Sequence, residues 1–398
     1  MILQHKPPLH LTYCLNIHPG EKWADNFAAI KERALAVKQR VAPDQWFGLG
    51  LRLAHHAAAE LAGNPGLVDE AREFFAEHQM YPFSVNGFPY GRFHAGSVKE
   101  KVYAPDWRTP ERRDYTMLLA DVFANFLPPE VDGSISTVPC SFKPWIQDDS
   151  ERILMAKNLG AVVAYLAALR DETGQEIHLG LEPEPDCYLE TTAEMISFFN
   201  NALLTAGVDE VARILGCTQP QAEVAMRCHL GVCLDTCHAA LQFEDPLECL
   251  RAYRAEGIRI SKIQISAALA GVASPELWDA LKPFAEPVYL HQVKATTKDG
   301  SRVAWYDLPT ALEEGPGFPE LDEVRVHFHV PLFFQYFGPL ASTASTLSAD
   351  FFHELREGAC SHLEIETYTF DVLPDAIRTD DVVKSIAREY SWVLGQLH

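Results

Sequence analysis

The sequence predicts an α/β fold, a (β/α)8 TIM barrel with one insertion, and three observations support this prediction. Short runs of strand-forming residues alternate with amphipathic stretches of helical period along most of the 398 residues. This alternation is typical of a parallel sheet covered by helices. No GxGxxG or GxxxxGK[ST] motif follows any of the runs, so a doubly wound nucleotide-binding sheet has no support. We therefore expect a single barrel domain over residues 1–398, a length that such barrels reach when they carry insertions.

Eight runs are predicted to form the barrel strands. They are residues 11–17, 46–53, 81–86, 133–139, 177–181, 230–235, 259–266 and 362–367. Helix patterns separate them, and two of these helices have clear start signals. Thr109 and Pro110 open the helix after the third strand, and Thr191 with Glu194 forms a capping box after the fifth.

A ninth run, residues 324–330, is one more than an eight-stranded barrel needs. The region before it, residues 288–318, has the pattern of a hairpin with a turn at Lys298-Asp299-Gly300. We therefore expect an insertion at about residues 285–340, between the seventh and eighth strands. It either covers the barrel mouth or mediates assembly.

Composition limits the partners and the compartment. Lys and Arg number 33 against 55 Asp and Glu, a formal net charge of −22 that repels phosphate backbones, so no nucleic acid partner is expected. The longest aliphatic stretch, residues 159–169, is too short to cross a bilayer, and no transmembrane segment is predicted. The N-terminus lacks a basic region followed by an apolar run, which predicts a cytoplasmic protein.

The nine cysteines are expected to be reduced thiols, because the chain shows no secretory signal. Cys228, Cys233 and Cys237 form the one cluster, but their spacing matches none of the usual zinc patterns. We expect buried thiols there.

Catalytic groups of such barrels lie at the carboxyl ends of the strands, where several acidic residues occur. Glu182 and Glu184 follow the fifth strand with the same parity, so both can point inward unless they belong to a solvated loop. Asp235 ends the sixth strand and His238 follows three residues later. The pair offers two metal ligands, or else a helix cap and a core histidine.

The later strands contribute further polar candidates. Gln264 lies between two isoleucines, and a buried amide needs a hydrogen-bond partner, in a pocket or in a structural network. Glu366 ends the last strand, while Glu364 lies one layer deeper and needs a partner. His327 and His329 share one strand face, in the core or at the site.

The loop after the third strand, residues 84–94, combines Gly, Pro and aromatic residues. It has the composition of a lid that faces the substrate or of a tight surface loop. Asn86 and His94 in this segment, and Lys99 beyond it, are therefore candidates for contacts with a substrate.

The order of Glu182, Asp235-x-x-His238, a polar residue in the seventh strand and Glu366 resembles that of the xylose isomerase-like TIM barrels. This superfamily includes sugar and sugar-phosphate isomerases and epimerases and the endonuclease IV group. Five phrases resemble more closely the metabolite traffic protein EboE group, which is encoded in a cluster associated with export of secondary-metabolite precursors. They are LTYCLN at 11–16, NGFPYG at 86–91, LHQV at 290–293, HFHVPL at 327–332 and ETYT at 366–369.

The resemblance implies a divalent metal cofactor, Mn²⁺, Zn²⁺ or Mg²⁺. In the epimerases two glutamates and an aspartate bind the ion together with a histidine from the seventh strand; carried over, the acidic ligands are Glu182, Asp235 and Glu366. Gln264 stands at the position of that histidine. Because an amide oxygen is a poorer zinc ligand than imidazole, His329 or His291 is expected to compensate.

Three functions follow. The first is a metal-dependent isomerase or epimerase of a polyhydroxylated carbonyl compound, in which Glu182 and Glu366 remove and return a proton. His238 would orient a substrate oxygen, and Lys99 or His94 would hold the far end. Further substrate contacts are expected from Asn86, His291, His327 and Tyr368.

The second function is a non-catalytic small-molecule binder in metabolite trafficking, as the EboE resemblance implies. Aromatic residues near the strand ends would then line an apolar pocket: Tyr13, Trp23, Phe88, Tyr90, Trp107 and Tyr368. The third, an endonuclease IV-like phosphodiesterase, is disfavoured by the net charge of −22.

Overall fold

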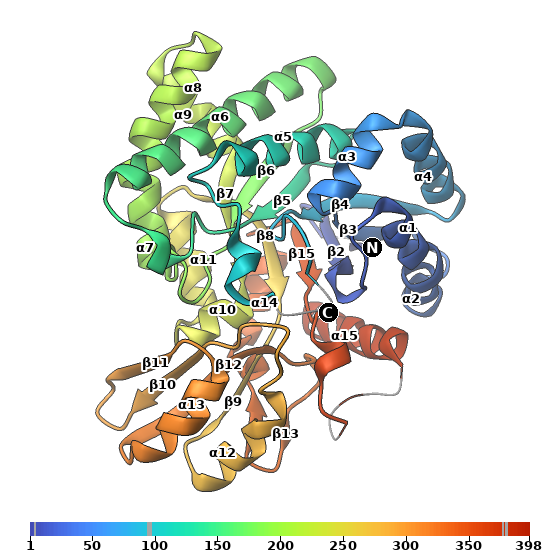
Figure 1. Ribbon diagram of the computed structural model, residues 1–398. Helices are drawn as coiled ribbons and strands as arrows, with labels where there is room; N and C mark the ends of the chain where they lie inside the picture. The colour runs from blue at the N-terminus through green and yellow to red at the C-terminus, as the bar shows by residue number, and fades with distance from the viewer. Residues whose placement is uncertain (4, 94–97, 376–377, 379–380) are drawn as a thin grey trace.

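The computed structural model describes residues 1–3, 5–93, 98–375, 378 and 381–398. Its centre is a barrel of eight parallel strands (Figure 1). In spatial order these are β2 (Leu9–Tyr13), β15 (His362–Ile365), β8 (Arg259–Ile265), β7 (Leu230–Asp235), β6 (Ile177–Leu181), β5 (Gly133–Thr137), β4 (Met80–Asn86) and β3 (Phe47–Arg52). A parallel bridge between Cys14 and Gly50 joins the two ends, and β1 (Ile2–Leu3) pairs antiparallel with β2.

Helices cover the outside of the barrel. They are α1 (Trp23–Ala29), α2 (Leu35–Val41), α3 (His55–Gly63), α4 (Pro65–Glu77), α5 (Pro110–Ala124), α6 (Ser150–Thr173), α7 (Thr192–Phe198), α8 (Val208–Leu215), α9 (Gln219–His229), α10 (Thr236–Leu241), α11 (Pro246–Ala255), α14 (Ala349–Arg356) and α15 (Val382–Leu397). Two π-helical segments, Ile30–Ala34 and Phe199–Gly207, continue α1 and α7. Short 3-10 turns occur at Leu15–Ile17, Lys99–Tyr103, Lys143–Trp145, Lys282–Phe284, Gly315–Gly317, Thr343–Thr346 and Phe370–Val372.

The predicted fold class is confirmed. The bounds predicted for β6 and β7 coincide with those observed, and the capping box of Thr191 and Glu194 is present at the start of α7. The first strand ends at Tyr13 because Leu15–Ile17 turns into a 3-10 helix.

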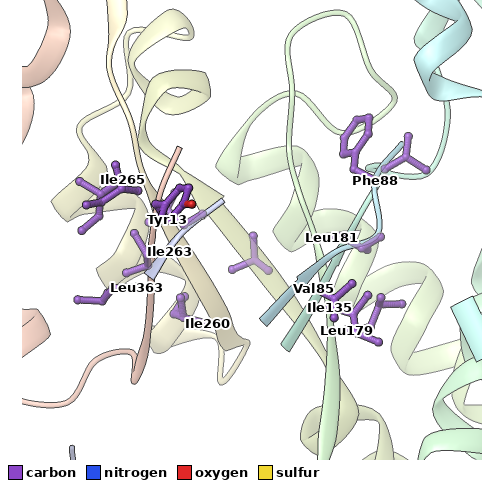
Figure 2. Close-up of a cluster of buried hydrophobic side chains, with 14 of the residues drawn as sticks. Tyr13, Val85, Phe88, Ile135, Leu179, Leu181, Ile260, Ile263, Ile265 and Leu363 are labelled. Carbon is purple, nitrogen blue, oxygen red and sulfur yellow. The ribbon is translucent and has the colours of Figure 1, made fainter. Parts of the chain in front are cut away.

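Alternate residues of the barrel strands divide into an apolar and a polar set. Ile135, Leu179 and Leu363 belong to a large buried apolar cluster (Figure 2). The residues that alternate with the apolar ones along the strands are mostly polar. Lys262 on β8 donates to Ser84 on β4 across the interior at 3.1 Å. Because successive strand residues point to opposite faces, the apolar set meets the helices and the polar set fills the barrel. This interior differs from the branched apolar filling usual in such barrels.

The segment between β8 and β15 forms a second sheet of six antiparallel strands, seen below the barrel in Figure 1. Its order is β11 (Arg302–Trp305), β10 (Val293–Thr297), β12 (Leu321–His329), β9 (Ala268–Val272), β14 (Leu340–Ser342) and β13 (Tyr336–Phe337), with α12 (Pro275–Leu281) and α13 (Leu308–Glu314) packed beside it. The predicted hairpin is β10–β11, and Gly300 in its turn has a φ of 84°. The sheet begins at Ala268, earlier than the expected 285, and β12 packs against α10.

One helix of the described chain, α6, is long and apolar enough to cross a membrane by length and composition, with a mean hydropathy of 1.4. Half of that stretch is buried inside the molecule. It packs against α5, α8 and α9, and a buried core helix passes the same test.

Candidate active site

A cavity of about 570 Å³ lies at the carboxyl ends of the barrel strands, and its two halves differ in chemistry. One half is polar and is lined by Asn16, Asn86, Glu182, Glu184, His238, His327, His329 and Glu366. The other half is apolar or aromatic and is lined by Phe88, Pro89, Phe93, Val98, Val102, Tyr103, Tyr289, Leu290 and Tyr368. Lys99 lies at its edge.

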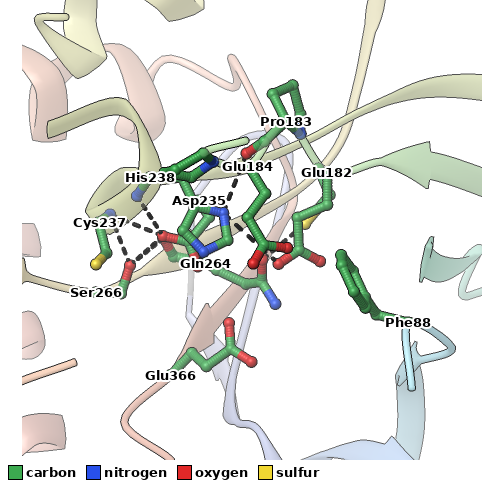
Figure 3. Close-up of polar contacts among 12 residues, drawn as sticks. Phe88, Glu182, Pro183, Glu184, Asp235, Cys237, His238, Gln264, Ser266 and Glu366 are labelled. Carbon is green, nitrogen blue, oxygen red and sulfur yellow. Dashed lines mark hydrogen bonds and ion pairs between the residues drawn. The ribbon is translucent and has the colours of Figure 1, made fainter. Parts of the chain in front are cut away.

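Three buried carboxylates meet below the polar half. Glu182 follows β6, Asp235 ends β7 and Glu366 follows β15, and they offer oxygen atoms that lie within 4.8 Å of one another. Figure 3 shows Glu182 and Glu366 reaching this space from opposite sides. Burial and the Asp235 carboxylate raise the pKa of Glu182 well above its usual value. Burial and Glu182 do the same to the pKa of Glu366, so the cluster carries repulsion that a cation would relieve.

Asp235 is held with one oxygen occupied and one open. Its Oδ1 accepts from the Ser266 hydroxyl at 2.6 Å and from the backbone N–H groups of Cys237 and His238 at 2.7 and 3.1 Å. Its Oδ2 has no hydrogen-bond partner among the described residues. Burial alone would raise the pKa of Asp235, but His238, His329 and the Ser266 hydrogen bond hold it below its usual value. The residue therefore stays an anion with one free oxygen.

Backbone carbonyls fix the tautomers of two imidazoles. His329 Nδ1 lies 2.9 Å from the carbonyl oxygen of Glu366, and His238 Nδ1 lies 3.0 Å from that of Pro183. A carbonyl oxygen only accepts, so both Nδ1 atoms carry the hydrogen and both Nε2 atoms present a lone pair. His238, His329 and Asp235 offer ligand atoms within 4.8 Å of one another, and His238 Nε2 lies 3.1 Å from His327 Nε2.

These donors fit a divalent metal ion. Glu182 Oε2, Asp235 Oδ2 and His329 Nε2 are all buried and lack a hydrogen-bond partner in the described part of the chain. Unpartnered buried polar atoms are costly, and a bound ion satisfies them. Asp235 belongs to two sets of ligand atoms that lie within 4.8 Å of one another, one with Glu182 and Glu366 and one with His238 and His329. The oxygen-rich set suits Mg²⁺ or Mn²⁺, and the imidazole also suits Zn²⁺.

Gln264, the residue at the position of the expected histidine, is fully buried beside this cluster. Its Oε1 accepts from the Cys233 thiol at 3.0 Å, and its Nε2 has no acceptor among the described residues. In this orientation the amide oxygen is occupied and the amide hydrogens lack an acceptor among the described residues. It would offer its oxygen to a metal ion only with the amide turned over.

The residues predicted to touch a substrate separate into three groups. Asn86, His327 and Tyr368 line the cavity, and Asn86 Nδ2 lies 3.3 Å from Glu366 Oε1. Lys99 also lines it but forms an ion pair with Asp307. His291 does not line the cavity: its ring nitrogens bond to Glu286 at 2.8 Å and to the backbone oxygen of His327 at 2.8 Å. His94 lies outside the described residues.

The aromatic residues expected near the strand ends also divide. Phe88 and Tyr368 line the cavity. Tyr13, Trp23 and Trp107 are at most 2% exposed and belong to the core. Tyr90 lines a neighbouring surface pocket together with Lys101.

Two residues that bond to carboxylates of the cavity, Asn16 and Tyr103, were not among the predicted site residues, whereas Glu184 was expected to point inward beside Glu182. Asn16 Nδ2 donates to Glu366 Oε1 at 2.6 Å, and the Tyr103 hydroxyl donates to Glu184 Oε1 at 2.9 Å. Burial raises the pKa of Glu184 to about 8, although the Tyr103 hydrogen bond opposes the shift. The shared parity of Glu182 and Glu184 was the available signal for Glu184, whereas nothing in the local sequence marks Tyr103.

No protein-family model matches the chain, and no curated protein matches it. Solved structures do. A xylose isomerase-like TIM barrel protein from Mycobacterium smegmatis, in complex with magnesium, aligns over 98% of this chain and 96% of its own with a TM-score of 0.51 and 11% identity. The likeness is one of fold, the TIM barrel.

A second solved structure, the IolI protein with a bound zinc atom, aligns over 98% of this chain and 99% of its own, with 12% identity and a TM-score of 0.48. In a TIM barrel the active site lies at the carboxyl ends of the strands. The cavity of this chain lies at those ends, so its position agrees with the fold.

Proposed function

We propose that this protein is a divalent-metal-dependent isomerase or epimerase acting on a small molecule that carries a hydroxyl next to a carbonyl group. The observation that carries the proposal is the cluster of the buried Glu182, Asp235 and Glu366 carboxylates beside a cavity, in which Glu182 and Asp235 each have one oxygen without a hydrogen-bond partner among the described residues. The magnesium bound by the structural neighbour from Mycobacterium smegmatis supports it.

Glu182, Asp235, His329 and Glu366 would hold the ion, and Gln264 would join them only with its amide turned over. A bound divalent ion supplies Lewis acidity, which stabilises negative charge developing on a carbonyl oxygen. Ser266 and the N–H groups at the start of α10 keep Asp235 ionised and oriented. Asn16 fixes Glu366 by donating to its Oε1 at 2.6 Å.

We assign proton transfer to Glu182 and Glu366, whose side chains approach each other from opposite sides in Figure 3. One takes the proton from the carbon that bears the hydroxyl. In an isomerisation it returns this proton to the neighbouring carbon, whereas in an epimerisation the other carboxyl group, itself protonated, delivers a proton to the first carbon from the opposite face. His238, which lines the cavity, would orient a substrate oxygen.

Elemental analysis of the purified protein tests the metal. About one divalent ion per chain is expected, with loss of the ion in Asp235→Ala and Glu366→Ala and retention in the surface control Glu354→Gln. Glu366→Gln is expected to fold normally and to lose turnover in a screen of hydroxycarbonyl substrates. A metal-free protein that takes up neither Mn²⁺ nor Zn²⁺, or a fully active Glu366→Gln variant, contradicts the proposal.

A non-catalytic small-molecule binder of the EboE type is the second candidate. Two observations favour it: Gln264 has its oxygen occupied by Cys233, and half of the cavity is apolar. A protein that binds a ligand without turnover, with or without metal, would support this function. An endonuclease IV-like activity receives less support, because Lys99 is the only Lys or Arg among the described residues that line the cavity, and it is paired with Asp307.

A further inference from the structure

We infer that the substrate combines a small metal-chelating head with a flat apolar tail and carries no phosphate. The inference rests on the proposed function, since it names the substrate class of the same site. It departs from a sugar or sugar phosphate, whose hydroxyl groups need polar partners along the whole molecule. The argument uses the size of the cavity, the chemistry of its two halves and the charge at its edge.

The cavity extends beyond the proposed metal-binding residues. Its volume of about 570 Å³ includes the space that opens to solvent. Half of the described residues that line it are apolar or aromatic. The rest of the volume is therefore available to a part of the ligand that does not react.

That remaining half offers few hydrogen bonds. Phe93, Tyr289 and Tyr368 form a triangle with ring centroids 5.2–5.4 Å apart. The Tyr368 ring also lies 4.7 Å from that of His329, so this aromatic wall begins directly beside the polar half. Aromatic faces and edges favour a flat apolar partner over a hydroxylated chain.

The opposite wall is apolar as well. The ring centroids of Phe88 and Tyr103 lie 6.1 Å apart, and Val98 and Val102 complete this side. The Tyr103 hydroxyl already donates to Glu184 and accepts from Gln292 at 3.1 Å, so it has little capacity left for a ligand. A polar tail would lose its hydration here without gaining partners, at a cost in binding.

The charge at the cavity edge also disfavours phosphate. Lys99, the only Lys or Arg among the described lining residues, donates to Asp307 Oδ2. Asp307 is itself fixed, since its Oδ1 accepts from the backbone N–H groups of His291 and Leu308 at 3.1 and 3.0 Å. Phosphate recognition normally uses free Arg or Lys side chains or a helix N-terminus.

Three hydroxamates with the same chelating head and different tails test the inference. Acetohydroxamate has almost no tail, 2-naphthohydroxamate has a flat apolar one, and phosphoglycolohydroxamate has a phosphate. Calorimetric titration of the Mn²⁺-loaded protein is expected to show at least tenfold tighter binding of the naphthyl compound than of acetohydroxamate. Phosphoglycolohydroxamate is expected to bind no tighter than acetohydroxamate.

Two variants make the test specific. Val102→Asp places a charge at the apolar wall. It should remove most of the naphthyl advantage, the tighter binding of 2-naphthohydroxamate than of acetohydroxamate, while leaving acetohydroxamate binding unchanged. Asp307→Asn keeps the acceptor for both N–H groups but releases Lys99, so binding of phosphoglycolohydroxamate alone should tighten several-fold. An unchanged naphthyl advantage in Val102→Asp would place the tail elsewhere and overturn the inference.

The order of the three affinities decides the inference separately from the proposed function. Tightest binding of phosphoglycolohydroxamate to the unmodified protein overturns it. The proposed function is tested by repeating the titrations after metal removal and by adding 2-naphthamide, which lacks the chelating head. Affinities that do not change without metal contradict the proposed function, whereas the naphthyl advantage over acetohydroxamate still reports on the tail.

Discussion

Lys262 Nζ lies 2.5 Å from Glu364 Oε2 inside the barrel, one layer below the carboxylates of the candidate active site. Both side chains are at most 1% exposed, and Lys262 also donates to the Ser84 hydroxyl at 3.1 Å. The expectation that Glu364 needs a partner is confirmed. The positive charge also lowers the pKa of Glu182 and Glu366, although burial and repulsion outweigh it.

Removing one member of this ion pair should destabilise the protein strongly. Lys262→Met leaves the Glu364 carboxylate buried and uncompensated, and breaking a buried pair costs about 3–5 kcal/mol. The free energy of unfolding from urea titration at pH 7 measures this. The exposed pair of Lys282 with Asp279 provides the control, since Lys282→Ala should change the free energy by under about 1 kcal/mol. A Lys262→Met variant as stable as this control would contradict the prediction.

Gly50 on β3 is required by the same ion pair. A Cβ atom at this position would lie 2.1 Å from Glu364 Oε1 and 3.0 Å from Thr12 Cγ2. Gly50→Ala should therefore lower the free energy of unfolding by about 1–3 kcal/mol, the usual cost of overpacking. Gly63→Ala, where a Cβ meets nothing within 4 Å, should be neutral or slightly stabilising. Equal effects of the two substitutions on thermal unfolding would rule out this explanation.

Glu389 on α15 should make stability depend on pH. Burial raises its pKa to about 7, although its Oε1 accepts from the Thr367 hydroxyl at 2.7 Å and the Leu332 N–H at 3.1 Å. Because the folded state holds this proton more tightly than the unfolded state, stability falls as pH rises from about 4.5 to 7. The full penalty, about 3 kcal/mol, applies above pH 7.

Glu389→Gln keeps the acceptor oxygen and removes the ionisation. Its melting temperature should exceed that of the unmodified protein at pH 8 and match it at pH 4.5, as thermal unfolding followed by circular dichroism would show. A difference that is the same at both pH values would mean that ionisation of Glu389 is not the cause.

Local patterns were sufficient to predict the barrel strands and the polar residues at their ends. β6 and β7 are mostly apolar runs that stop at Glu182 and at Asp235, so chain position and side-chain parity already place both carboxylates at one edge of the sheet. The insertion was harder to predict. β9 consists of Ala, Leu, Gly and Val with no turn signal before it, and its partner β12 is distant in sequence.

The remaining part of the site depends on contacts between distant segments. Asn16 reaches Glu366 from a 3-10 turn after β2, and Tyr103 reaches Glu184 from another 3-10 turn. Neither turn has a periodicity that marks a site. His291 is the opposite case. It is a prominent candidate in the sequence, but its Nδ1 bonds to the backbone oxygen of His327 and so stabilises β12.

Ser266 should control metal affinity without touching the ion. Its hydroxyl donates to Asp235 Oδ1 at 2.6 Å and so directs Oδ2 toward the other ligands. Loss of such an indirect partner typically weakens metal binding 10–100-fold. Calorimetric titration of the metal-free Ser266→Ala variant with Mn²⁺ should show a loss of about that size. Ser261→Ala is the matched control, because this equally buried hydroxyl donates to the Leu179 carbonyl at 3.0 Å and contacts no proposed ligand. An equal loss in both variants would mean that any cavity in the barrel weakens the site, and Asp235 would then not be oriented by Ser266.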